Sequence, residues 1–330
     1  MVIFIVGVIL LSAGHMHKKY ISDKKEKGIS SMALKDIGIT EEKVRMFFES
    51  KKPGAVLFKY AFFAGSLILI AGILMNLIFL FRNKGVIPMP AAEKKPVSWG
   101  IADVFRVLII VVFSGYMLSA AAAIVFRSFY SNMDANLHMI LGTFFIDIIA
   151  GITIFYFVLV KYRQKLSGLG IGLSGFYRNL ISGVTAYIFI LPFLIIALII
   201  SILILDAIGY KPPPQPVLDM FFEEKRNNVI LFLTIFISVL GPMIEEIFFR
   251  GFLYSAVRKR FGVLIGVLLS AGLFSTLHTN AVGFLPIMIL GILTAFLYEI
   301  TGSLIASMAV HIVHNSIIVG FVFFIKELLK

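Results

Sequence analysis

The chain contains no cysteine and little charge. Among its 330 residues there is no Cys and a single Trp, and Asp, Glu, Lys and Arg together make up 15%, against about 25% in an average soluble domain. The absence of cysteine excludes disulfides, thiolate metal sites and a cysteine nucleophile. Any chemistry must therefore use carboxylate, imidazole, hydroxyl or amide groups.

Apolar residues are abundant instead. They make up 59% of the chain, the mean hydropathy is +0.99, and the longest runs reach the ~20 residues that cross a bilayer. A membrane β-barrel would show segments of alternating polarity about 10 residues long, whereas these runs are unbroken. The sequence predicts an all-α, polytopic transmembrane helical bundle with about eight to nine spans.

The apolar runs divide the chain into four parts. We expect a short N-terminal anchor over 1–14, a basic polar segment with an interfacial helix over 15–57, N-terminal transmembrane helices over 58–165, and a C-terminal bundle over 166–330. The interfacial helix is expected from Thr40 to Lys51, with an apolar stripe of Val44, Phe47 and Phe48. The eight expected spans are 58–81, 107–126, 137–160, 180–205, 229–253, 263–278, 284–300 and 304–325.

The charge balance is strongly basic, with 30 Lys and Arg against 18 Asp and Glu. Basic residues in the loops of a membrane protein lie beside anionic headgroups, so we expect the lipid bilayer as a partner and no nucleic acid. The basic residues of different loops predict opposite orientations in the membrane, so the orientation of the chain stays open. The expected location is an integral, multi-pass membrane protein, in the plasma membrane if the source is prokaryotic.

Charged residues inside apolar runs are concentrated in the last third of the chain, and each is a candidate functional group. Glu245, Glu246 and Arg250 follow a Gly241-Pro242 pair that should break or kink the helix. Glu246 and Arg250 are four residues apart and can pair on one helix face. Glu245 is then a surplus buried acid, which is a candidate general base.

Two further helices carry polar groups. His278 ends one apolar run, while His311 and Asn315 are four apart on the last and share a face. In the N-terminal half Asp147 is the one clear intramembrane aspartate, and we expect it to bond a neighbouring helix or His138. An aspartyl protease would need two such aspartates.

The three patterns Glu-Glu-x-x-x-Arg, Phe-x-x-x-His and His-x-x-x-Asn occur in that order on successive apolar helices, within residues 225–325. Here the sequence resembles the type II CAAX prenyl endopeptidases, the glutamate intramembrane proteases grouped with the Abi (CPBP) bacteriocin-processing and immunity proteins. The resemblance implies that Glu245 and His278 activate a water, that His311 and Asn315 stabilise the oxyanion, and that Glu246 and Arg250 support the site. It makes 166–330 the catalytic bundle and implies no cofactor.

Two alternatives stay open. Zinc could be held by Glu245, His278 and His311, although the His-Glu-x-x-His helix of many zinc peptidases is absent. The chain could also be a non-catalytic scaffold or immunity protein of the same fold. For the endopeptidase, the expected partner is a peptide or protein substrate at the membrane, with or without an attached lipid.

Overall fold

The computed structural model describes residues 41–81, 97–129, 135–210, 216–278 and 280–328. Over these ranges the chain is helical and contains no strand, which confirms the all-α fold class. Seven helical segments are long and apolar enough to cross a membrane, so the chain is a multi-pass integral membrane protein. The expected N-terminal anchor and the part of the basic segment before residue 41 lie outside the described residues.

The helices follow the predicted runs and extend a few residues past several of them. The π-helical segments are η1, η3 and η4, and η2 is a short 3₁₀ turn. In chain order the elements are α3 (Glu41–Glu49), α4 (Pro53–Phe81), α5 (Ile101–Phe129), α6 (Ala135–Phe155), η1 (Tyr156–Lys161), η2 (Leu166–Leu169), α7 (Phe176–Ala207), α8 (Pro216–Glu223), α9 (Asn227–Ile235), η3 (Phe236–Leu240), α10 (Gly241–Glu246), η4 (Ile247–Tyr254), α11 (Ser255–Thr276), α12 (Phe284–Thr301) and α13 (Leu304–Leu328).

The segment from α9 to α11 is a helical hairpin. It runs for 50 residues, and at 1.5 Å per residue it would be about 75 Å long, more than twice the ~30 Å of a bilayer core. Gly262, with φ 83° and ψ 177°, interrupts the helix. After it the chain returns, and the Ser270 hydroxyl donates to the Phe249 carbonyl at 3.0 Å. The two spans predicted for this stretch are therefore joined at a glycine whose backbone conformation disfavours other residues.

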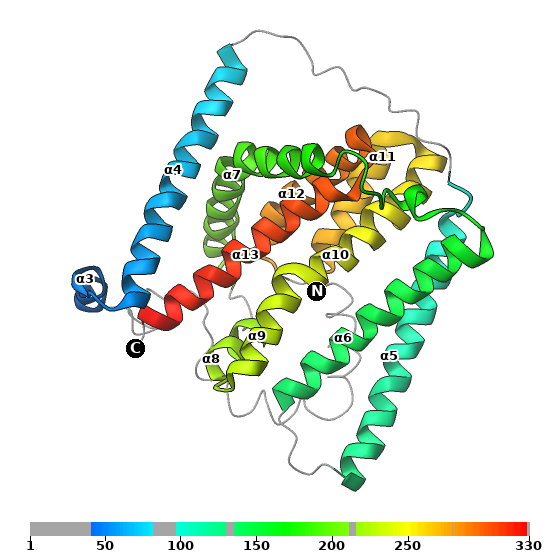
Figure 1. Cartoon of the computed structure of the whole chain (residues 1–330), viewed down its shortest axis with the longest axis horizontal. Helices are drawn as coiled ribbons and strands as arrows, with labels where there is room; N and C mark the ends of the chain where they lie inside the picture. Colours follow the sequence, from blue (N-terminus) through cyan, green and yellow to red (C-terminus); the bar gives the residue numbers. More distant parts are fainter. Residues whose placement is uncertain (1–40, 82–96, 130–134, 211–215, 279, 329–330) are drawn as a thin grey trace.

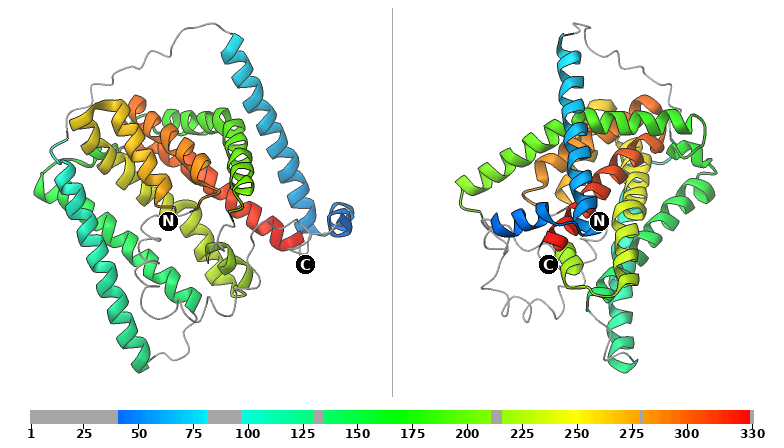
Figure 2. Two further views of the ribbon diagram at one scale, coloured as in Figure 1. Left: turned by 180° about the vertical axis from the view of Figure 1, so that it is seen from behind. Right: turned by 60° about the vertical axis from the view of Figure 1, so that its left-hand side comes forward.

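The helices form a central bundle with two flanks (Figures 1 and 2). Helices α7 and α10 to α13 lie in the centre, the α5–α6 pair lies on one side, and α4 lies on the other. The helix predicted near residues 40–51 is present as α3, beside the end of α13. Its Val44 and Phe47 pack against that end, while Phe48 is exposed.

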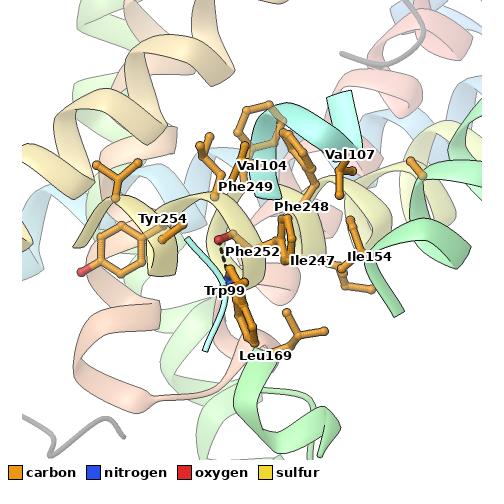
Figure 3. Close-up of a cluster of buried hydrophobic side chains, with 14 of the residues drawn as sticks. Trp99, Val104, Val107, Ile154, Leu169, Ile247, Phe248, Phe249, Phe252 and Tyr254 are labelled. Atoms are coloured by element: carbon orange, nitrogen blue, oxygen red, sulfur yellow. Dashed lines mark hydrogen bonds between the residues drawn. The ribbon is translucent and has the colours of Figure 1, made fainter. Parts of the chain in front are cut away.

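The largest buried apolar cluster joins α5, α6 and η4 (Figure 3). Trp99 is fully buried, its ring stacks on Phe252 with centroids 5.4 Å apart, and its Nε1–H donates to the Phe252 carbonyl at 3.0 Å. Beside it, a side chain at Gly251 would meet Leu169. This packing holds the N-terminal helices against the segment that carries the predicted site.

Helix α7 changes direction along its length, with Pro192 inside it (Figure 1). A proline has no N–H and leaves the carbonyl four residues earlier without its helical donor. That carbonyl belongs to Ile188, and α4 approaches it so closely that a side chain at Gly72 would overlap it. The next carbonyl, of Phe189, accepts a 2.8 Å hydrogen bond from the Asn76 side chain on α4. Helix α4 is therefore bonded to α7 at the carbonyl next to the one that lost its helical donor.

Candidate active site

The helix that carries the predicted acids is irregular before and after them. In η3 the Gly241 N–H bonds the Phe236 carbonyl, five residues back. The same spacing would pair the Ile237 carbonyl with Pro242, which has no N–H. The Asn315 Nδ2 on α13 donates to that carbonyl at 2.9 Å instead. Such π-helical insertions occur often at functional sites.

Glu246 and Arg250 form the ion pair that their spacing predicts. Both side chains are fully buried, and the Glu246 Oε1 lies 3.1 Å from an Arg250 guanidinium nitrogen. The guanidinium stacks over the Phe274 ring at 4.4 Å and donates weakly to the Gly291 carbonyl at 3.4 Å. The charge of Glu246 is thus balanced inside the protein, where an isolated carboxylate would be costly.

His311 connects the two glutamates. Its Nδ1 lies 3.0 Å from Glu246 Oε1, and its Nε2 lies 3.8 Å from Glu245 Oε2. A carboxylate accepts hydrogen bonds, so the hydrogen on Nδ1 points to Glu246. The contact between His311 and Glu246 joins α13 to α10, and the sequence pattern gave no signal for it.

Glu245 and His278 also lie in this buried region. The Glu245 side chain is 1% exposed, and its Oε2 lies 3.8 Å from His311 Nε2. His278 and His311 both pack against the Phe274 ring. His278 follows the end of α11, and its Nδ1 lies 2.6 Å from the Phe274 carbonyl. Because a carbonyl only accepts, Nδ1 carries the hydrogen and Nε2 of a neutral His278 is an acceptor. The arrangement therefore offers one carboxylate and one imidazole acceptor.

Asn315 is placed differently from the other five predicted residues. Its amide is half-buried and donates one N–H to η3, eight residues before Glu245. One N–H of the side chain remains. The structure thus brings Glu245, Glu246, Arg250, His278 and His311 together and holds Asn315 against the preceding turns.

Two residues without an assigned role also lie here. His314 follows His311 by three residues on α13, and its Nδ1 lies 3.2 Å from the Tyr187 hydroxyl on α7. Tyr187 is buried. Tyr187 sits in a long apolar run with no charged neighbour nearby in the chain, and no sequence signal pointed to it.

The zinc alternative would need at least three ligands that point at one ion. Among the described residues, no three His, Asp or Glu side chains converge as metal ligands would. We therefore derive no step through zinc.

These features define the class of protein: it is a helical membrane protein with carboxylates and imidazoles buried inside its bundle. Residues 227–317 match the family model of the Rce1-like type II CAAX prenyl endopeptidases, which confirms the resemblance inferred from the motifs. The match spans well under half of the chain and contains all six predicted residues. The Rce1-like family is a family of proteases, so the match supports the general prediction of an endopeptidase. No curated protein and no solved structure matched the chain.

Proposed function

We propose that this chain is an intramembrane endopeptidase in which Glu245 and His278 activate a water molecule. The observation that carries the proposal is a buried acid, Glu245, whose carboxylate lies 3.8 Å from His311, which packs on the same Phe274 ring as His278. Glu246 pairs with Arg250, whereas Glu245 faces the Nε2 of His311. A carboxylate in such a place serves well as a general base.

In the proposed reaction Glu245 takes one proton from the water while the oxygen attacks the carbonyl carbon of the peptide. The Nε2 of His278 accepts a hydrogen bond from the other hydrogen of the water, and this bond holds the attacking oxygen in place. A C–O bond forms and the carbonyl oxygen becomes an oxyanion. When the C–N bond then breaks, Glu245 returns its proton to the leaving nitrogen.

His311 and Asn315 would stabilise the oxyanion. With its Nδ1–H directed to Glu246, His311 can donate from Nε2 only as the charged imidazolium. Asn315 has one N–H left after its bond to Ile237. Donors placed where negative charge develops are often the largest contribution to the rate.

The substrate is proposed to be a peptide or protein segment at the membrane, with or without a lipid. The lipid bilayer is the other partner, and we propose no nucleic acid and no cofactor. The competing function is a non-catalytic scaffold or immunity protein, in which the same buried residues serve packing alone.

The test compares new peptide termini in host membranes that contain the wild-type chain, Glu245→Gln or Glu299→Gln. Glu299 is a matched control, because it is a buried glutamate on α12 that accepts from Tyr254 and pairs with Arg258. We expect new termini with the wild type and with Glu299→Gln, with or without a chelator, and none with Glu245→Gln. Identical termini in all three membranes would favour the scaffold, and termini lost only with the chelator would favour a metal.

A further inference from the structure

A third imidazole lies beside the proposed site and has no role in the reaction described above. His314 follows His311 by three residues on α13, so the two Cβ atoms lie about 5–6 Å apart. The ring of His314 meets the Tyr187 ring of α7 edge to face, with centroids 5.9 Å apart, and its Nδ1 lies 3.2 Å from the Tyr187 hydroxyl. His314 thus joins α13 to α7 next to the residues of the site.

The interface between α7 and α13 is otherwise tight and apolar. One turn before Tyr187, a side chain at Gly183 would overlap the Ala306 carbonyl of α13. Ala306, Val310 and His314 are spaced four residues apart and share one face of α13. Ala306 and Val310 are buried in the same apolar cluster as Tyr187. Apolar residues would pack equally well at the positions of the polar pair, so packing alone does not require it.

The hydrogen bond to Tyr187 decides which nitrogen of His314 carries the hydrogen. A phenol can donate and accept, whereas each nitrogen of a neutral imidazole does only one of the two. Tyr187 is 2% exposed, and within the described ranges its hydroxyl has no hydrogen-bond partner besides His314. If Nδ1 carried the hydrogen, the phenolic hydrogen would be buried without an acceptor, which is costly. Tyr187 therefore donates to Nδ1, and the hydrogen of a neutral His314 lies on Nε2.

This Nε2–H has no acceptor in the part of the chain that the structure describes. The side chain of His314 is half-buried, so another molecule can reach the ring. His314 lies ten residues after the start of α13, about 15 Å along the helix, which is half of a ~30 Å hydrocarbon core. Lipid tails contain no acceptor, and an unpaired polar group among them is costly. The donor therefore fits a ligand that brings its own acceptor into the membrane.

We propose that His314, held by Tyr187, is a substrate-binding residue whose Nε2–H donates to a backbone carbonyl of the peptide. The inference rests on the proposed function, since it assigns a contact to the proposed substrate. A peptide segment in the membrane has carbonyls that need donors. His278 and His311 carry their hydrogens on Nδ1, so their neutral forms accept at Nε2. His314 is the imidazole of this group that donates from Nε2 while neutral.

The kinetic test uses the full-length protein in lipid and a peptide that spans a cleavage site found in the experiment above. His314→Leu removes the donor, whereas His314→Gln keeps an N–H. A contact made equally to the substrate and to the transition state changes KM and leaves kcat unchanged. We therefore expect His314→Leu to raise KM about 3- to 10-fold, as for one hydrogen bond between neutral groups, with kcat within about twofold. His314→Gln should raise KM by less.

Two tyrosine variants form a matched pair for the same assay. Tyr187→Phe leaves the ring in place and frees the tautomer of His314, so we expect KM to rise by a smaller factor than in His314→Leu. Tyr298→Phe is the control, because Tyr298 is also buried and its hydroxyl lies 3.5 Å from the Ser255 Oγ. We expect wild-type kcat and KM for this variant.

Three outcomes overturn the proposal. If His314→Leu keeps the wild-type KM, the side chain does not contact the substrate. If kcat falls and KM does not change, His314 acts in the chemical step and not in binding. If Tyr298→Phe raises KM as much as Tyr187→Phe does, the effect of Tyr187→Phe comes from general disturbance of the bundle.

A second readout needs no activity. Nitrogen-15 NMR of histidine-labelled protein in lipid distinguishes protonated from unprotonated ring nitrogens, and His314→Gln identifies the signals of His314. Above the usual imidazole pKa of about 6.5, we expect an unprotonated Nδ1 and a protonated Nε2 in the wild type, and a mixture of tautomers in Tyr187→Phe. A protonated Nδ1 in the wild type refutes the proposal. If the chain cleaves no peptide but the hydrogen lies on Nε2, the proposed function fails while the donor state of His314 stands.

Discussion

The hydrogen bond between Asn315 and the Ile237 carbonyl can be tested by giving that carbonyl another donor. Asn315→Ala leaves the carbonyl without a partner, since Pro242 has no N–H to offer. A carbonyl left unpaired in this way costs about 1–3 kcal/mol, and the lower end applies to bonds between membrane helices. Pro242→Ala restores an N–H at the spacing that Gly241 already uses. We therefore expect Asn315→Ala to be destabilising alone and nearly neutral in the Pro242→Ala background.

The assay is a double-mutant cycle on the free energy of unfolding, measured with denaturant in mixed micelles. We expect a coupling energy of about 1 kcal/mol between the two positions, within the usual range for residues that share a partner. Additive effects, to within about 0.5 kcal/mol, would refute the reasoning. Activity measurements separate the structural role of Asn315 from its proposed role at the oxyanion. If Asn315 also donates to the oxyanion, Asn315→Ala lowers kcat by about 10²–10³, which is a larger loss than that of substrate binding. Pro242→Ala then does not restore kcat. An equal loss of turnover and binding would mean that the asparagine is structural.

Two further predictions concern charges. Arg250→Met leaves Glu246 without its cation and should destabilise the protein by about 3–5 kcal/mol, and adding Glu246→Gln should recover part of this loss. Thermal unfolding in detergent measures the stability of both variants. No recovery in the double variant would contradict the pairing. Outside the spans, hydrogen bonds from Arg226 lower the pKa of Glu224 from 4.5 to about 2. Because the pKa is lowered in the folded state, the stability from this pair is fully present above about pH 4.5 and is lost as the pH falls toward 2. Glu224→Gln should flatten that part of the stability profile, and an unchanged slope would show that other acids cause it.

Composition and run length predicted the spans because the bilayer selects for length and apolarity, whatever the helices pack against. Even the double span between residues 229 and 278 was predicted, since charged residues at 258–260 separate its two runs. The helix bounds were less accurate. Helix α5 begins at Ile101 rather than 107, because a helix continues into the polar region beyond the hydrocarbon core.

The site could be predicted only where its contacts lie within one helix. Glu246 and Arg250 are one turn apart, so periodicity places them together. The contact of His311 with Glu246 depends on how α13 docks on α10, and periodicity carries no information about docking. The hydrogen bond expected from Asp147 to a neighbouring helix is not found among the described residues, and the alternative partner, the His138 side chain, lies outside them.

The asparagines at the two prolines fix how far one helix can slide along another. Apolar helices in lipid have no hydrophobic force that prefers one axial position, and a shift of one turn, about 5.4 Å, would leave apolar contacts much as they were. The carbonyls of Phe189 and Ile237 each accept a hydrogen bond from an asparagine on the facing helix. An axial shift would separate Asn76 or Asn315 from the oxygen that each bonds on the facing helix. Two asparagine side chains thus set the height at which α4 meets α7 and α13 meets η3, and with the latter the level of His311 relative to the acids.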